Sequence, residues 1–353
     1  MTPQPKTAAT AADLRGARMF RVAIVGAATL KGKEIAEVLR DRNFPAIDVR
    51  LLDDDESLGR LEALGDEMSF IQSVRAEQFE HVDFTFFASD PHCTSENWRT
   101  ARDLGNTIID LSYTLEDEAL ATIRSPWVER QSGRLVAPEL QPMPAVVAHP
   151  AATVIALLAS RAGKIQRVIA TVCEPASEHG QKGMDELHEQ TVNLLSFQEL
   201  PKNIYDIQIA FNMVTRYGLR SSPPLQQVSE RIRKHYRKIA PDLIEPSLFV
   251  VQAPIFHGHA LAIYFETETP VTAEEFSQRL TGDHVVVAKG AEDTPTNVSA
   301  AGQGDILVSL ARDSSRENGI WVWVSADNLR VSALTAIECA ESMTASRPRG
   351  QIQ

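Results

Sequence analysis

A short turn at residues 149–153 joins a strand-like run over 145–148 to an apolar helix-like run over 154–158. The N-terminal end of a helix carries partial positive charge, which activates a thiol placed there as a nucleophile. The turn reads His-Pro-Ala-Ala-Thr, so Ala152 presents only a methyl group at this place. A methyl group cannot attack a carbonyl carbon, and covalent catalysis is therefore not expected at Ala152.

A second turn, at residues 25–32, joins a strand-like run over 21–25 to an amphipathic helix-like run over 32–40. In dinucleotide-binding folds the pyrophosphate rests on the helix N-terminus at this point. Gly26, followed by Ala27, and Gly32 keep part of the expected glycine pattern, but Thr29 stands at its middle position. We expect a side chain there to crowd the phosphates or to force a different turn. The alternative is a turn kept only for packing.

Four consecutive acids, from Asp53 through Asp54 to Glu56, follow the next strand-like run over 49–52. A carboxylate in this place commonly binds the ribose 2′-hydroxyl of the adenosine. Four acids would repel the 2′-phosphate of NADP. If a dinucleotide binds, we therefore expect NAD, held weakly, and not NADP. The alternative is a solvated acidic loop.

The order of these runs predicts the fold class. Strand-like runs alternate with helix-length segments up to residue 150, which is typical of a doubly wound parallel sheet of the Rossmann kind. Longer strand-like runs follow, over 168–172, 248–253, 260–266 and 320–324. They indicate an α+β unit whose mixed sheet has helices on one face. A last helix is predicted over 333–343.

Composition limits the classes of function. The chain has 353 residues, 43% of them hydrophobic and 23% charged, which is typical of a globular protein with two domains. Its net charge of -12 disfavours nucleic acid or an anionic membrane as the partner. Three scattered cysteines suit a reducing cytoplasm without structural disulfides. No apolar run is long enough to cross a membrane.

Several segments, in order along nearly the whole chain, resemble the aspartate-semialdehyde dehydrogenase family. They read Arg-Asn-Phe-Pro at 42–45, Val-Ala-Pro-Glu-Leu at 136–140, Gln-Ile-Ala-Phe-Asn at 208–212, Pro-Ile-Phe-His-Gly-His at 254–259 and Ala-Asp-Asn-Leu-Arg at 326–330. The chain is most similar to the usg-type members, which lack the catalytic cysteine. The N-terminal stretch, rich in Ala, Thr and Pro, is expected to be a disordered tail over 1–18. The resemblance implies an NAD(P)-binding domain over 19–150 and a dimerisation and substrate domain over 151–333. The segment 334–353 is expected to pack back on the first domain.

The resemblance also assigns roles to single residues. Ala152 stands where the family has its nucleophilic cysteine, and His259 matches the family's general base. Three further positions of the substrate site carry different chemistry, since Gln252 replaces an arginine, Glu174 a glutamine and Glu116 a phosphate-binding arginine. Asn328 is placed in the cofactor-binding set with the residues of the glycine turn and the acidic loop.

Two functions remain open on this basis. The first is a family member that does not catalyse the family reaction and serves to bind a nucleotide or a protein partner that the sequence does not identify. The second is an active NAD-dependent oxidoreductase that acts on another aldehyde or oxo substrate without a thioester, with His259 as acid or base. Cys93, beside His92, and Cys173 are weaker candidates for chemistry, and Cys173 is expected in the core. No metal is expected, because only His257 and His259 share a strand face.

The same second unit is expected to form a symmetric homodimer. Trp321 and Trp323 alternate on one strand and so share a face that needs an apolar neighbour. An isologous contact between two such sheets would cover that face. The alternative is a monomer whose own helices cover it.

Overall fold

The computed structural model describes residues 19–54, 59, 61–64, 67–134, 143–290 and 293–344. The predicted tail over 1–18, Glu56, the segment 136–140 and the end of the chain after Thr344 lie outside these residues.

A parallel sheet of seven strands forms the first unit, in the order β5-β2-β1-β6-β7-β9-β8. Its strands are β1 (Phe20–Val25), β2 (Ala46–Asp53), β5 (Gln72–Ser73), β6 (Phe84–Phe87), β7 (Thr107–Asp110), β8 (Thr122–Arg124) and β9 (Ala145–Val147). Every residue of β6 and β7 is buried, because helices cover both faces of the sheet. The prediction of a doubly wound parallel sheet is confirmed.

Helices connect these strands in the alternating manner that the sequence predicts. They are α1 (Leu30–Asp41), the short 3-10 helix η3 (Ala76–Phe79), α2 (Pro91–Asp103) and α3 (Pro126–Gln131), with a hairpin of β3 (Leu61–Leu64) and β4 (Glu67–Phe70) beside them. The helix α1 begins two residues earlier than predicted, because Thr29 caps its N-terminus and accepts a hydrogen bond from the backbone of Gly32.

A mixed sheet of six strands forms the second unit, in the order β11-β10-β12-β15-β14-β13. Its strands are β10 (Ile165–Glu174), β11 (Ser247–Gln252), β12 (His259–Thr267), β13 (Val285–Val287), β14 (Ile306–Arg312) and β15 (Gly319–Ala326). The helices α4 (Pro150–Arg161), α6 (Leu225–Ile239) and α7 (Ala273–Leu280) pack against one face. The predicted mixed sheet with helices on one face is confirmed, and α8 (Asn297–Ala300) lies beside β15.

The other face of this sheet leaves large apolar side chains exposed. Trp321 and Trp323 are 44% and 39% exposed, and Phe249 is 55% exposed on β11. The register aligns Trp321 with Tyr264 and Ile169 across three neighbouring strands. The predicted tryptophan face therefore exists, and the described part of this chain leaves these side chains 39–55% exposed.

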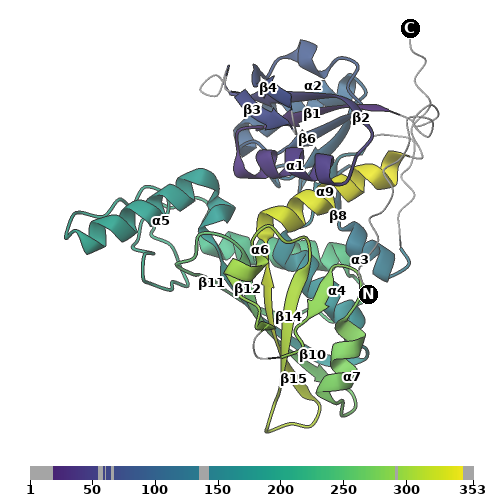
Figure 1. Cartoon of the computed structure of the whole chain (residues 1–353), viewed down its shortest axis with the longest axis vertical. Helices are drawn as coiled ribbons and strands as arrows, with labels where there is room; N and C mark the ends of the chain where they lie inside the picture. The colour runs from purple at the N-terminus through teal and green to yellow at the C-terminus, as the bar shows by residue number, and fades with distance from the viewer. Residues whose placement is uncertain are drawn as a thin grey trace.

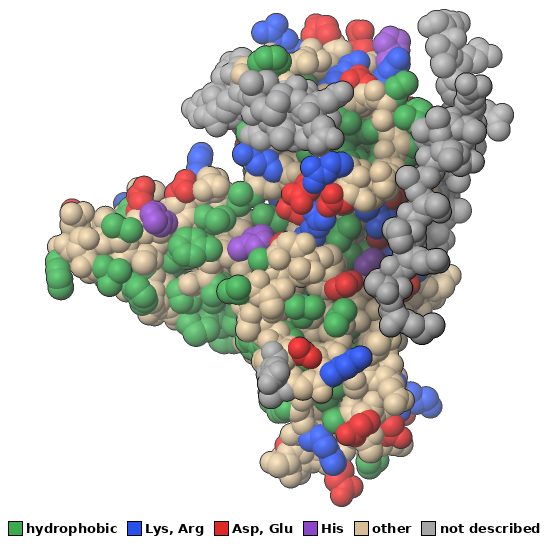
Figure 2. Space-filling view, viewed as in Figure 1, with side chains coloured by type: hydrophobic (Ala, Val, Ile, Leu, Met, Phe, Trp, Pro, Cys, Tyr) green, Lys and Arg blue, Asp and Glu red, His purple; other side chains and the backbone are tan. Residues whose placement is uncertain are grey.

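A projecting arm extends the second unit, as Figure 1 shows on its left side. It contains the 3-10 helix η4 (Ala176–His179), α5 (Gly180–Leu195) and the connection that leads to α6. Figure 2 shows hydrophobic side chains gathered over this arm and the surface below it. Phe197, Leu219 and Phe211 are 98%, 97% and 68% exposed.

The last helix, α9 (Asn328–Thr344), returns to the first unit and packs against α1 (Figure 1). It begins five residues earlier than predicted, because the Asp327 side chain accepts hydrogen bonds from the backbone of Leu329 and Arg330. The Arg330 guanidinium then bonds Glu34 on α1 at 2.9 Å. Among the described residues, no helix has both the length and the hydropathy needed to cross a membrane.

Candidate functional site

The glycine turn keeps its tight geometry. Gly26 has φ +84°, and a Cβ atom there would lie 2.5 Å from the backbone nitrogen of Ser89. A Cβ on Gly32 would lie 2.0 Å from the Gly26 oxygen, so both positions require glycine. Thr29 has an ordinary φ of -71°, and its hydroxyl donates to the Gly26 oxygen at 2.8 Å. Thr29 thus bonds within the turn, and the expected crowding of the phosphates stays a prediction.

A carboxylate from the acidic loop closes this turn. Asp53, at the carboxyl end of β2, accepts a 2.6 Å hydrogen bond from the backbone of Ala28 and a 2.9 Å bond from that of Asp54. The Asp53 side chain is 8% exposed, and burial raises its pKa. The acid that the sequence assigns to a ribose thus occupies one backbone donor of the turn, whereas Asp54 is exposed.

The position of the missing nucleophile lies in the first turn of α4. Ala152 is fully buried there. His149 caps the helix, since its Nδ1 accepts from the Ala151 backbone at 3.2 Å. The His149 backbone in turn donates to His235 Nδ1 at 2.8 Å. The helix N-terminus is thereby built as the sequence predicts, without a reactive group at residue 152.

Opposite this helix end, Glu174 and His259 form a buried pair. His259 Nε2 and Glu174 Oε2 are 3.0 Å apart, and each residue is 1% exposed. Burial alone would lower the pKa of His259, but the facing Glu174 carboxylate raises it above the ordinary value. His259, the expected general base, is therefore engaged by Glu174.

Gln252 supports this pair through the backbone. Its amide nitrogen donates to the carbonyl oxygens of Glu174 and Ala253, both at 2.9 Å. Its amide oxygen accepts from the Tyr217 hydroxyl at 2.6 Å, and that hydroxyl also lies 2.9 Å from His179 Nε2. Gln252 is fully buried with its hydrogen bonds made inside the protein, so it fixes the end of β11 instead of presenting a ligand-binding group.

A second acid, Glu178 on η4, receives a cation from the glycine turn. Lys31 Nζ lies 3.7 Å from Glu178 Oε2, and it donates to the Leu111 carbonyl at 3.3 Å. Asn328 donates to Glu178 Oε1 at 2.7 Å. The Glu178 side chain is 6% exposed, and its burial would raise its pKa, but Lys31 and the nearby histidines lower it. Lys31 thus connects the nucleotide-binding turn with the acids of the second unit.

Glu116 fills a third position of the site with an internal ion pair. Arg231 on α6 donates from Nε and Nη2 to its carboxylate at 3.1–3.2 Å, and His235 Nε2 lies 2.8 Å away. Burial opposes ionisation, yet His235 and Arg231 lower the pKa of Glu116 to about 2. A guanidinium and an imidazole that could bind an anionic ligand are therefore held by an anion of the same chain.

The structure brings the predicted residues into two neighbouring groups. Gly26, Thr29, Gly32 and Asp53 form the first group, at the glycine turn. Glu174, Gln252 and His259 form the second, and Ala152 lies in the first turn of α4 beside them. Asn328 belongs to the same group through Glu178, not to the glycine turn itself. Lys31 and His149 are not among the predicted site residues, because they meet Glu178 and His235 through contacts between distant segments.

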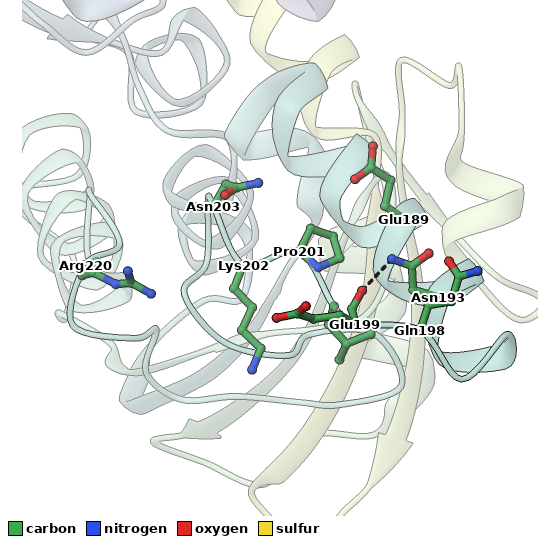
Figure 3. A pocket seen from close by; sticks show the side chains of 9 residues that line it. Glu189, Asn193, Gln198, Glu199, Pro201, Lys202, Asn203 and Arg220 are labelled. Carbon is green, nitrogen blue, oxygen red and sulfur yellow. Dashed lines mark hydrogen bonds between the residues drawn. The ribbon is translucent and has the colours of Figure 1, made fainter.

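A separate open pocket of about 720 Å³ lies on the arm, away from these residues. Figure 3 shows its polar walls, with Glu189, Lys202 and Arg220 among the side chains that line it. Asn193 donates to the Glu199 carbonyl at 2.7 Å across one side. Acidic and basic side chains both line this pocket, and none of the predicted site residues does, so the pocket is separate from the predicted site.

Comparison with known proteins identifies relatives of both units. Residues 21–143 match the family model of the semialdehyde dehydrogenase NAD binding domain, and residues 155–331 match that of the semialdehyde dehydrogenase dimerisation domain. An aspartate-semialdehyde dehydrogenase of Rickettsia bellii is 28% identical over 351 residues, covering 92% of this chain and 98% of the relative. A USG-1 protein homolog of Pseudomonas aeruginosa is also 28% identical, covering 91% and 97%.

A solved structure agrees with this relationship. The structure of a probable aspartate-semialdehyde dehydrogenase from Pseudomonas aeruginosa superposes with a TM-score of 0.81 at 26% identity. The match covers 92% of this chain and 98% of that one. The similarity therefore extends over both units in sequence and in space.

The Glu116 ion pair leads to a prediction about acid stability. A fall of the pKa from 4.5 to about 2 corresponds to roughly 3 kcal/mol of folding free energy. Because the folded-state pKa is depressed, this contribution is complete above 4.5 and is lost as the pH falls towards 2. Glu116→Gln should therefore destabilise the protein near neutral pH, by up to about 3 kcal/mol, and its deficit should shrink in that acidic window.

Urea unfolding of both proteins over a series of pH values measures this deficit. Asp117→Asn is the matched control, because Asp117 is adjacent and also pairs with α6, through Lys234, but its side chain is 86% exposed. It should change stability by about 0.5 kcal/mol at most. A Glu116→Gln deficit that stays constant from neutral to acidic pH would contradict the prediction.

Proposed function

We propose that this chain, which belongs to the semialdehyde dehydrogenase family, does not catalyse the aspartate-semialdehyde dehydrogenase reaction and acts as a homodimeric binding protein. The single observation that carries the proposal is the internal pairing of charge at the site. Glu174 is engaged by His259, Glu178 by Lys31, and Glu116 by Arg231 and His235.

The missing nucleophile supports the same proposal. The family reaction that the resemblance implies needs a thiolate that attacks the aldehyde, and then a hydride transfer and attack by phosphate. At the helix end where that thiolate would stand, Ala152 presents a buried methyl group. Gln252 offers no cation for a substrate carboxylate, because its amide is bonded within the protein. The site therefore lacks the thiolate that covalent attack needs and the cation that would bind a substrate carboxylate.

The alternative, an active oxidoreductase for another carbonyl substrate, needs an acid or base that reaches the substrate. His259 is 1% exposed and its Nε2 is bonded to Glu174. A substrate would have to displace this carboxylate before His259 could transfer a proton to it. The geometry therefore favours the inactive family member over this alternative.

The family's NAD-binding domain is present, and the glycine turn tests how well a dinucleotide fits. Gly26 and Gly32 keep the close backbone packing of the turn, but the Ala28 N–H already donates to Asp53. A pyrophosphate would have to compete with that carboxylate, and Asp54 adds a further negative charge beside it. When bound, the nicotinamide would supply a hydride acceptor or donor. We therefore propose weak binding of NAD and poorer binding of NADP.

The apolar faces support the proposed homodimer. The exposed tryptophans of β15 lie on the sheet face that α4, α6 and α7 leave uncovered, and Phe249 lies on the same sheet. Exposed apolar patches of this kind mark protein interfaces. A second copy covers the sheet face by symmetry and leaves the polar first unit free. Cys93, Cys173 and Cys339 are unpaired, which fits the cytoplasm that we propose as the compartment.

The first test is enzymatic. The protein should not reduce NADP with aspartate semialdehyde and phosphate above the rate of a buffer control. Ala152→Cys should not rescue turnover, because the anion-binding groups remain replaced or paired. An authentic aspartate-semialdehyde dehydrogenase assayed in parallel shows that the substrates are competent. Turnover by the unmodified chain, or a large gain in the single variant, would refute the proposal.

The second test is a calorimetric titration with NAD and with NADP. NAD should bind more tightly, on the order of tenfold, because the 2′-phosphate adds negative charge beside Asp53 and Asp54. Asp54→Asn should narrow that preference by removing one of the two charges, without altering the bond from Ala28 to Asp53. Tighter binding of NADP by the unmodified protein would show that the acidic loop does not face the ribose.

The third test is the mass in solution. Sedimentation at micromolar concentration should give twice the 38.9 kDa chain mass. Trp321→Glu should yield monomers, because it places a charge in the proposed interface. Leu120→Glu serves as the control, since Leu120 is 61% exposed but lies in the first unit. A monomeric unmodified protein, or a Trp321→Glu variant that stays dimeric, would exclude this interface.

A further inference from the structure

One buried nitrogen at the site lacks a partner. His259 is 1% exposed, and its Nδ1 makes no hydrogen bond within the described structure. The facing Glu174 carboxylate accepts from Nε2, so Nδ1 is an N–H without an acceptor in the imidazolium and a lone pair without a donor in the neutral ring. A buried polar atom without a partner is costly, and such a group in a folded protein calls for a water or an ion. The lone pair of the neutral ring is the form that a cation can bind.

Two other ligand groups lie beside this ring. His149, Glu178 and His259 each place a potential ligand atom within 4.8 Å of those of the other two. The three residues come from the cap of α4, from η4 and from the start of β12. The strand, the 3-10 helix and the buried helix end hold them in place before any ligand arrives.

We propose that these three residues form a binding site for a divalent transition-metal ion such as Zn²⁺ or Co²⁺. Two imidazoles and a carboxylate are a ligand set that these ions accept, with further positions left for water. Glu174 would orient His259, because a metal-bound histidine typically donates its other ring N–H to a carboxylate. The proposal does not rest on the proposed function, since metal binding requires neither nucleotide nor turnover.

The second acid has an oxygen available for the metal. Glu178 Oε1 is held by Asn328 at 2.7 Å, whereas Oε2 faces Lys31 Nζ at 3.7 Å, beyond hydrogen-bonding distance. The ammonium of Lys31 is bonded instead to the Leu111 carbonyl and the Tyr113 hydroxyl. Lys31 therefore opposes a second cation by its charge without blocking the carboxylate by a direct hydrogen bond, and it is expected to weaken the metal site.

To bind a metal ion, His149 must rearrange more than His259 or Glu178. Its Nδ1 accepts from the Ala151 backbone at 3.2 Å, so the neutral ring carries its proton on Nε2. Ligation through Nε2 changes the tautomer and gives up the bond from Ala151, and ligation through Nδ1 displaces that N–H. His259 and Glu178 are therefore expected to dominate the affinity.

The sequence predicted no metal, on the basis of His257 and His259 alone. The structure separates these two, because His257 precedes β12 and bonds Asp327 at 2.7 Å. His259 instead meets His149 and Glu178, which are remote from it in the chain. The cluster depends on the packing of α4 and η4 around the start of β12, and the alternation pattern of a single strand cannot reveal it.

Co²⁺ titration of the full chain tests the site, because d–d absorption reports protein ligands directly. We expect one Co²⁺ per chain, a visible band, and displacement by Zn²⁺. His259→Asn and Glu178→Gln should abolish the band, and Glu174→Gln should weaken binding by about 10- to 100-fold. Lys31→Met should bind more tightly than the unmodified protein, because it removes the cation that faces Glu178.

His257→Asn is the matched control, since it removes an imidazole two residues away that bonds Asp327 instead of the cluster. It should keep the band and the stoichiometry. Circular dichroism of each variant without metal separates loss of the site from loss of the fold. The proposal is overturned if the unmodified protein binds no Co²⁺, or if folded His259→Asn and Glu178→Gln variants bind it as the unmodified protein does.

Discussion

The buried pair of Glu174 and His259 is the contact around which the rest of the site is arranged. A carboxyl group at 1% exposure needs a hydrogen-bond partner inside the protein, and His259 supplies it from the neighbouring strand. Gln252 then binds the Glu174 carbonyl from the other neighbouring strand and makes no contact outside the protein. Because Glu174 is buried, the side chains around it must supply its hydrogen-bond partners.

The same compensation extends outward from this pair. Glu178 attracts Lys31 from the first unit, and Glu116 attracts Arg231 and His235 from α6. In each case an acid of one unit or loop meets a cation from a different element. A site that is balanced in this way has little electrostatic reason to bind a small anion, because each cation is already matched at short range.

Much of the fold follows from local sequence, whereas the site follows only in part. The alternation of buried strands and helices up to residue 150 was sufficient to predict the parallel sheet, and the alternating tryptophans predicted an exposed face. The capping of α1 by Thr29 could not be predicted, because it depends on the direction of the threonine side chain. Lys31 gave no local signal, because its contact with Glu178 arises only when the two units pack together. The contact of His149 with His235 joins residues 86 positions apart and gave none either.

The contact between α1 and α9 has a consequence for how the chain is made. Arg330 lies 296 residues after Glu34, yet it closes the surface of a helix that is synthesised long before it. Until α9 leaves the ribosome, α1 must keep its buried apolar stripe and the acids around it without the cover that α9 provides. The first unit therefore cannot complete its packing while the second unit is being translated, and its folding is finished only after α9 has been made.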